Sequence, residues 1–481
     1  MNYLKLAFTL SFIVGMTLSC VPKLKGPPDL AVDVPQTWIS EEASVEGDIS
    51  RWWTRFDDSQ LNSVIDRVLS ENYDLKAAAA RMDAAASLAR IAGADLYPGV
   101  SGSFSAVRQK RNFVGFPFPG TGDGVPSSTS SLFGVSLDVS WEVDLWGRLR
   151  AARSAAVADF QASEADLIGF QLSLAGQTAK AWYAAVEAEL QVRLAQATLS
   201  NYRETNDQVW LRYRRGLRPS LDVRLSESNV ATAEAVLTQR QDQLQRIKRQ
   251  IETLLGRYPA SRITLSENLP AISEPVPAGL PADIVQRRPD LIAAEKRLAA
   301  SYARLIESRR ALYPRISLTG SGGTSSDELS NLLDGDYSVW NLIGNLIQPL
   351  FQGGRLRAGV RLAQAREQEA LALYAQRVLS AYAEVETSLA AEKYLEQREE
   401  AVENAAEQAM AARRLAQDRY ARGLTDLIEV LEAQRRAFDS QSQLLSLRRQ
   451  RLDNRIDLYL ALGGDFAATV HEPVDLEKES R

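Results

Sequence analysis

The chain carries few side chains of the types that catalyse reactions or bind metals. Its 481 residues include one cysteine, Cys20, and one histidine, His471. One cysteine leaves no partner for an intramolecular disulfide, and one histidine is too few for a histidine-based metal site or catalytic dyad. Two of the four methionines, Met1 and Met16, lie in the N-terminal segment, so a methionine-rich path for soft metals has no support. The sequence therefore predicts no catalytic residue, no metal site and no cofactor.

The single cysteine directly follows a segment that has the features of a signal peptide. After a lysine, residues 6–18 form an apolar stretch of 13 residues, which is too short to cross a bilayer. A lone cysteine in mid-chain is usually an inert buried residue. After such a stretch and the small Ser19, Cys20 instead fits the acylated first residue of a bacterial lipoprotein, although Thr17 stands where leucine is usual. We predict a signal peptide at 1–19 and a covalent lipid such as palmitate on Cys20.

The composition is that of an ordinary folded chain. Hydrophobic residues make up 45% of it and charged residues 24%. The net charge of −5 and the isoelectric point near 5.4 argue against a nucleic-acid partner, which favours a basic surface. No stretch after residue 20 offers the roughly 18 uninterrupted apolar residues of a spanning helix. If the chain crosses a membrane, it must do so with strands.

The sequence contains an internal repeat, so the same set of predicted helices and strands occurs twice. Four short motifs recur at an offset of 216 or 207 positions. They are the matched pairs 72–75 with 288–291, 97–98 with 313–314, 147–151 with 354–358 and 216–217 with 423–424. The offset changes at one place only, so the two copies differ by the length of one loop.

Each copy predicts a helix, a strand, a loop, a second strand, a very long helix, a tight turn and a return helix. The long helices lack proline over about 68 residues and are rich in good helix formers, so each would extend roughly 100 Å. Such lengths are typical of coiled-coil packing, and a glycine ends each helix. The predicted division is a signal peptide (1–19), a lipid-anchored N-terminal tether (20–50), a first repeat (51–265, with strands at about 99–107 and 132–146, long helix 148–215 and return helix 219–255), a second repeat (266–464, with strands at about 315–322 and 338–351, long helix 355–422 and return helix 425–462) and a polar C-terminal tail (465–481).

The strands indicate a sheet that faces lipid. Residues 133–145 alternate strictly between apolar and polar side chains. Alternation alone fits a sheet half-buried on a soluble core, but 13 residues also satisfy the 9–11 that cross a bilayer at a tilt. Because open sheet edges are not tolerated in lipid, four strands per chain require an oligomer. A dimer would give a barrel filled by its own side chains. We therefore expect a trimer, and a tetramer stays open.

Four stretches resemble the TolC-type outer-membrane efflux channels, particularly the lipoprotein branch that works with resistance-nodulation-division pumps. They are 52–61 (WWTRFDDSQL), 141–148 (WEVDLWGR), 280–314 with its LPAD, RRPD and YP motifs, and 419–435 with RY, GL and VLEAQR. The match covers roughly residues 38–464. The resemblance implies a mixed α and β membrane protein, a homotrimer whose twelve-stranded outer-membrane β-barrel is continuous with a twelve-helix periplasmic α-barrel. It also implies docking to a periplasmic adaptor and an inner-membrane transporter, and passive export of small molecules, as in multidrug resistance.

The resemblance further implies which residues control the pore. Glu429 and Glu432 match an acidic constriction, and Ile428 an apolar collar beside it. Crowding of such carboxylates in a trimer is expected to raise some of their pKa values. Without the resemblance, these residues would be read as a solvated helix face.

The same resemblance implies how the pore is held shut and where the adaptor binds. Asp222, Arg419 and Tyr420 match a releasable latch, with an ion pair between Arg419 and Asp222. The turns at Gly216 and Leu217 and at Gly423 and Leu424 match the tips that dock to the adaptor, and they have basic neighbours that include Arg218.

Two other classes of protein are considered. A periplasmic adaptor also has long helical hairpins and often a lipid anchor, but would lack two pairs of strands per chain. An enzyme on a helical scaffold is disfavoured by the single histidine, the single cysteine and the lack of glycine-rich phosphate loops, while catalysis by carboxylates alone stays open.

Overall fold

A computed structural model describes residues 37–40, 51–114, 125–272, 276–279 and 281–464. The predicted signal peptide, the predicted acylation site Cys20, most of the predicted tether and the predicted C-terminal tail lie outside these residues.

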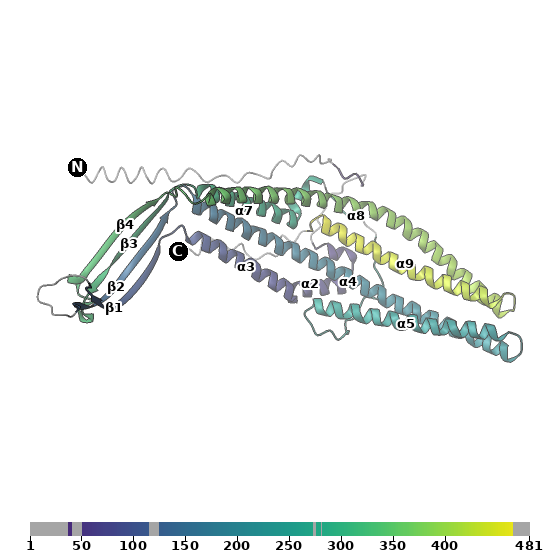
Figure 1. Ribbon diagram of the computed structural model, residues 1–481. Helices are drawn as coiled ribbons and strands as arrows, with labels where there is room; N and C mark the ends of the chain where they lie inside the picture. The colour runs from purple at the N-terminus through teal and green to yellow at the C-terminus, as the bar shows by residue number, and fades with distance from the viewer. Residues whose placement is uncertain (1–36, 41–50, 115–124, 273–275, 280, 465–481) are drawn as a thin grey trace. The chain divides into compact units, whose positions relative to one another are not determined.

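The helices and strands occur in the same order in the two halves of the chain (Figure 1). The first half contains η1 (Trp52–Phe56), α2 (Ser59–Glu71), α3 (Tyr73–Ala94), β1 (Gly99–Asn112), β2 (Ser127–Val143), α4 (Arg148–Arg214) and α5 (Ser220–Leu254). The second contains η2 (Pro281–Asp283), α6 (Ile284–Arg287), α7 (Pro289–Arg310), β3 (Arg315–Ser326), η3 (Leu329–Asn331), η4 (Gly335–Tyr337), β4 (Ser338–Ile347), α8 (Arg355–Ala421) and α9 (Leu427–Ala461). None of the described helices combines the length and the apolar character needed to cross a membrane.

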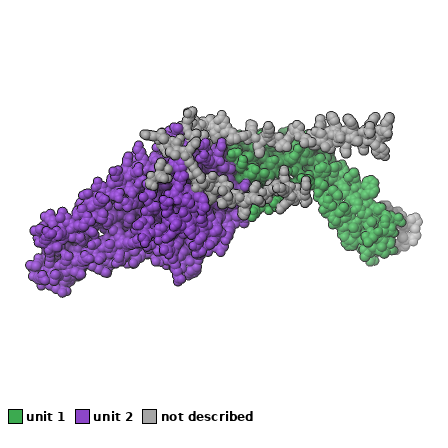
Figure 2. All heavy atoms as spheres, turned by 180° about the vertical axis from the view of Figure 1, so that it is seen from behind, with its two compact units in different colours: residues 1–29, 83–162, 295–373 green, residues 30–82, 163–294, 374–481 purple. Residues whose placement is uncertain are grey.

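The chain forms two compact units, and each unit contains segments from both halves of the sequence (Figure 2). One unit holds residues 83–162 and 295–373, which include all four strands. The other, called the second unit below, holds residues 30–82, 163–294 and 374–481. The two repeats are therefore not separate folding units.

The four strands form one antiparallel sheet in the order β1-β2-β3-β4. Its register places Phe104 opposite Val135, Leu137 opposite Gly322, and Leu318 opposite Gly344. Because residues opposite one another point to the same side, the apolar residues of neighbouring strands share one face of the sheet. That face is exposed in the single chain: Phe104 is 62% exposed and Trp340 82%.

The opposite face of the sheet is mainly polar. The Ser103 and Ser136 hydroxyls lie 2.7 Å apart across β1 and β2, and each lies within hydrogen-bond distance of Asp138 Oδ2. Gly323 lies where β3 approaches β2 most closely, because a Cβ there would be 2.0 Å from the carbonyl oxygen of Val135. The predicted alternation therefore describes a sheet with one apolar and one polar face.

The ends of the return helices are capped in the same way in both repeats. The Asn72 side chain donates to the carbonyl of Leu254 at the end of α5, at 2.9 Å. At the equivalent place in the second repeat, Arg288 donates to the carbonyl of Ala461 at the end of α9, at 3.0 Å. A leading helix thus begins where a return helix ends, and side chains satisfy carbonyls that the helix leaves unpaired. Gly463, with φ +95°, completes the second junction, since a Cβ there would lie 3.1 Å from the Arg287 backbone.

An aromatic cluster forms the centre of the second unit. Trp52 is fully buried and stacks on Tyr459 of α9 with ring centroids 5.5 Å apart. Phe56 packs edge-on against Tyr183 of α4, also at 5.5 Å. The aromatic segment that begins the folded body thus connects α4 with α9.

A buried hydrogen bond fixes the position of α2 on α4. Trp182 of α4 is fully buried, and its indole Nε1 donates to Asp58 Oδ2 at 2.8 Å. Asp58 Oδ1 accepts from the backbone N–H groups of Gln60 and Leu61, both at 3.0 Å, and so caps the N-terminus of α2. The Asp58 carboxylate thus both caps α2 and binds α2 to α4.

The short segment 37–40 is attached to the same unit. Trp38 is 3% exposed, and its Nε1 donates to the carbonyl of Gly279 at 3.1 Å. The backbone N–H groups of Ile39 and Ser40 donate to the Glu386 carboxylate of α8 at 2.8 and 3.0 Å. This contact fixes the last described part of the predicted tether.

Candidate functional site at the helical tips

Both long helices end in the same glycine turn. Gly216 and Gly423 have φ values of +71° and +77°, which glycine adopts without strain. The N–H of Leu217 donates to the carbonyl of Arg212 at 2.9 Å, and the N–H of Leu424 to that of Arg419 at 2.8 Å. These are Schellman motifs, which satisfy the last carbonyls of a helix. They leave Leu217 and Leu424, the predicted docking residues, 68% and 63% exposed.

A small apolar core lies beneath the two turns and joins the tips of the hairpins α4–α5 and α8–α9. Its members are almost fully buried, between 0% and 5% exposed: Val209, Val223, Tyr420, Leu427 and Val430. Since these residues come from all four helices, the core holds one hairpin against the other.

Two guanidinium groups cover the Tyr420 ring of this core. Arg212 lies 4.4 Å from the ring centroid and Arg218 lies 5.4 Å from it, as in cation–π contacts. Arg212 also donates to the carbonyls of Tyr420 and Ala421 at 2.8 and 2.9 Å. Burial raises the pKa of the Tyr420 hydroxyl, and the positive charges of Arg212 and Arg218 offset part of that rise. The phenol therefore stays neutral at physiological pH.

The ion pairs at the tip differ from the predicted latch. Arg218 Nη1 lies 3.1 Å from Asp426 and 3.8 Å from Asp222, so it connects the two turns. Within the described part of the chain, Arg419 forms no ion pair with Asp222. The physical reason is position: Arg218 and Asp222 are four residues apart and face one another across the start of α5.

The three predicted pore residues lie in the first two turns of α9. Ile428 is 67% exposed, and Glu429 is exposed and accepts a hydrogen bond from the Thr425 hydroxyl. Glu432 accepts from Arg436 at 2.6 Å and from Arg435 at 2.9 Å.

Two arginines surround the carboxylate of Glu432 within one chain. Hydrogen bonds from Arg436 and Arg435 hold the pKa of Glu432 below its ordinary value within one chain. Crowded carboxylates in a trimer would raise the pKa of Glu432 only if their effect exceeded that of these two guanidinium groups.

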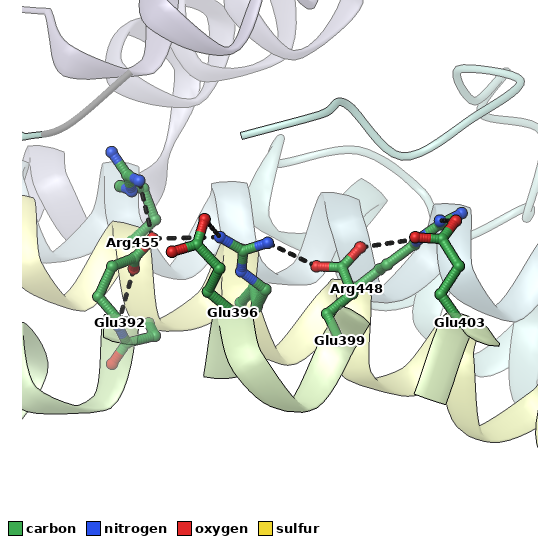
Figure 3. A network of polar contacts seen from close by, with 8 residues as sticks. Glu392, Glu396, Glu399, Glu403, Arg448 and Arg455 are labelled. Carbon is green, nitrogen blue, oxygen red and sulfur yellow. Dashed lines mark hydrogen bonds and ion pairs between the residues drawn. The ribbon is translucent and has the colours of Figure 1, made fainter. Parts of the chain in front are cut away.

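Above the tip, a ladder of ion pairs connects α8 with α9 (Figure 3). Arg455 contacts Glu392 at 2.7 Å, Arg451 contacts Glu399 at 2.7 Å, and Arg448 contacts Glu399 at 3.0 Å. Glu396 and Glu403 extend the ladder. The glutamates recur at spacings of four and three residues, which places them on one face of the helix. The sequence alone does not tell whether such a charged face packs against another helix or faces solvent.

The ladder is confined to the second repeat. At the offset of 207 residues, its glutamates correspond to Ala185, Glu189, Val192 and Gln196, and its arginines to Gln241, Leu244 and Lys248. Among the described residues, these positions give one cross-helix pair, between Lys248 and Glu189 at 3.6 Å, and α4 and α5 share a further pair, Arg203 with Glu234 at 2.7 Å, nearer the tip. The two hairpins are therefore held together by different forces.

Replacing Glu399 by glutamine is expected to lower the free energy of unfolding by about 2 kcal/mol, because the carboxylate joins two arginines at a largely buried place. Chemical unfolding followed by circular dichroism measures the change. Glu407→Gln, at an exposed position of the same helix, is the control. Equal stability of both variants would contradict a structural role for the ladder.

A second charged cluster lies between α4 and α9. The Asp453 carboxylate is paired with Arg449, and Lys180 is paired with Asp457. Glu187 of α4 faces the same cluster and lies 3.8 Å from Arg449. Burial raises the pKa of Asp453 to about 6, although Arg449 and Lys180 act in the opposite direction.

Asp453 should make the fold less stable at neutral pH than at pH 5. Its pKa is higher in the folded chain than in the unfolded one, so the folded chain binds the proton more tightly. Stability should therefore increase as the pH falls through 6, by about 1.4 kcal/mol between pH 7.5 and pH 5, and the full effect is reached only below the unfolded pKa of 3.8. Unfolding measured between pH 7.5 and 5 should show this change in the wild type but not in Asp453→Asn. An unchanged pH profile in Asp453→Asn would refute it, and Asp242→Asn, on the exposed side of α5, is the control.

The sequence comparisons agree with one another. The sequence profile described as outer membrane efflux protein matches residues 64–257 and 280–464. The chain is 33% identical to the pyoverdine export outer membrane protein OpmQ of Pseudomonas putida, over 92% of this chain and 94% of that protein. It is 31% identical to the outer membrane protein OprJ of Pseudomonas aeruginosa, over 96% and 97% of the two chains.

A solved structure shares the fold. The outer-membrane channel OprN superposes with a TM-score of 0.82 at 30% sequence identity, over 92% of this chain and 98% of that one.

Proposed function

This chain belongs to the outer membrane efflux protein family, and we propose from that premise that it is the outer-membrane channel of a tripartite efflux pump. It would act as a passive duct from a pump to the exterior rather than as an enzyme. The sparse set of catalytic side chains supports this, since one histidine and one cysteine occur in the whole sequence.

The observation that carries the proposal is the sheet. Among the residues that the structure describes, four strands present one apolar face, and each of the two outer strands, β1 and β4, pairs with one neighbour only. In a membrane such edges need partners from other chains. Three copies would supply twelve strands, enough to enclose a pore. An adaptor would not need an exposed apolar sheet of this kind.

The tip is proposed to control the pore. Glu429, Glu432 and Ile428 would form the constriction. The latch would consist of the predicted Asp222, Arg419 and Tyr420. The contacts of Arg218 within one chain support adding it to that set.

Three partners complete the proposal. The exposed Leu217 and Leu424 would contact a periplasmic adaptor, which in turn would join an inner-membrane transporter. A lipid on Cys20 would anchor the chain in the outer membrane. Mass spectrometry of the mature N-terminus tests this modification.

The decisive experiment uses the purified full-length chain in detergent and in planar bilayers. We expect light scattering to give the mass of a trimer and the bilayer to show discrete ion currents. A monomer that conducts no ions would refute the channel, and a conducting tetramer would refute only the trimer.

A further inference from the structure

A polar cleft of about 600 Å³ lies beside the aromatic core of the second unit. Its walls come from the first two turns of α2, the Trp182 ring on α4, and the segment that follows α5. The volume is in the range of sites for small molecules. Nothing in the proposed export function requires a cleft at this place.

Three arginines line the cleft: Arg67, Arg257 and Arg262. Arg257 lies 3.5 Å from Glu71, and both side chains are about half exposed. Among the residues that the structure describes, neither Arg67 nor Arg262 forms an ion pair, and Arg67 Nη2 is buried with no hydrogen-bond partner.

The one carboxylate in the lining, Glu252, forms no ion pair with these arginines within the described part of the chain. Both oxygens of Glu252 accept from backbone N–H groups, from Ser261 at 2.5 Å and from Arg262 at 2.6 Å. Glu252 thus holds the loop in place. The cleft keeps an excess of positive charge from its three guanidinium groups.

A buried N–H group without an acceptor costs free energy. The guanidinium group of arginine is also the side chain best suited to bidentate hydrogen bonding with a carboxylate or a phosphate. Ser63 adds a hydroxyl donor to the same wall. Tyr258, which is 87% exposed, adds aromatic surface against which the body of a small molecule can pack. The lining therefore combines charge for an oxyanion with surface for the group that carries it.

We propose that this cleft binds a small soluble oxyanion of the phosphate or polycarboxylate class, with Arg67 as its central contact. The cleft contains none of the residues of the two glycine turns or of the proposed constriction, so binding there would be independent of export. The ligand would reduce the repulsion among the three cations.

Isothermal titration calorimetry on the full-length chain in detergent tests the proposal. Inorganic phosphate and citrate are titrated separately, in a buffer of low ionic strength whose anion is chloride. We expect saturable binding of at least one of them, with one site per chain. The anion that binds shows whether phosphate or carboxylate is preferred, and added sodium chloride should weaken the binding.

Two variants locate the site. Arg67→Gln is expected to weaken binding at least tenfold, and Arg262→Gln to weaken it by a smaller factor. Arg246→Gln is the matched control, because Arg246 lies outside the lining, is 75% exposed and pairs with Asp242. No binding of either anion, or equal affinity in Arg67→Gln and wild type, would overturn the proposal. Ion currents of Arg67→Gln are recorded in parallel. A normal current shows that the channel is intact, so a failure of the anion-binding proposal can be told from a failure of the proposed export function.

Discussion

Replacing Trp182 by alanine is expected to lower the free energy of unfolding by about 3–5 kcal/mol. The indole is fully buried in the second unit, so its removal leaves a large cavity. It also removes the donor to Asp58, the residue that caps α2. Chemical unfolding in detergent, followed by circular dichroism, measures the loss.

Two further variants separate the causes. Trp182→Phe keeps an aromatic ring but not the hydrogen bond, so a smaller loss of about 1–2 kcal/mol is expected. Tyr394→Ala removes an aromatic side chain that is 68% exposed, and should change stability little. If Trp182→Ala were no less stable than Tyr394→Ala, the aromatic core would not hold the unit together.

The double variant Arg212→Ala with Arg218→Ala is expected to raise the open probability of the pore more than tenfold. The two guanidinium groups cover the Tyr420 ring, and Arg218 also pairs with Asp426 of the other turn. Together these contacts contribute about 2 kcal/mol per chain, and 1.4 kcal/mol corresponds to a factor of ten. Single-channel recording in planar bilayers gives the open probability directly.

Controls distinguish this latch from the one predicted by resemblance. Tyr420→Phe keeps the ring beneath the arginines and should have a much smaller effect. Arg419→Ala should have little effect if the single-chain contacts hold the tip closed. A large effect of Arg419→Ala together with no effect of the double variant would instead support the predicted pairing of Arg419 with Asp222, with the two residues on different chains.

The sequence predicted the long helices closely and the strand ends less well. Proline-free stretches and glycine stops placed α4 and α8 within a residue of where the structure has them. Strand β2 ends at Val143, before the expected 146, because the Asp144 carboxylate accepts from Leu149 and Arg150 and so belongs to the start of α4. Strand β4 ends at Ile347 because the partner of that residue, Arg315, is the first of β3. Such limits depend on pairing partners that local patterns do not reveal.

The contacts of the tip were the hardest part to predict. Arg218 looked like a surface charge beside a turn, but the fold places it on the ring of Tyr420, 202 residues later. Which of several arginines reaches a given carboxylate depends on how two hairpins pack, and charge alone does not decide it. The ion-pair ladder was missed for the same reason, since Glu399 and Arg451 become partners only when α8 and α9 are side by side.

The central strand pair, β2 with β3, has a consequence for biogenesis. It joins residues between 173 and 193 positions apart, such as Val143 with Ile316 and Phe133 with Ser326. Pairing over such sequence distances is slow, because a long loop must close before any contact is gained. The hairpin β1–β2 must therefore wait for the second half of the chain to be synthesised and exported. During that interval the hairpin exposes its apolar face without its partner strand, so assembly of the sheet is expected to be the step at which newly made chains aggregate or are degraded.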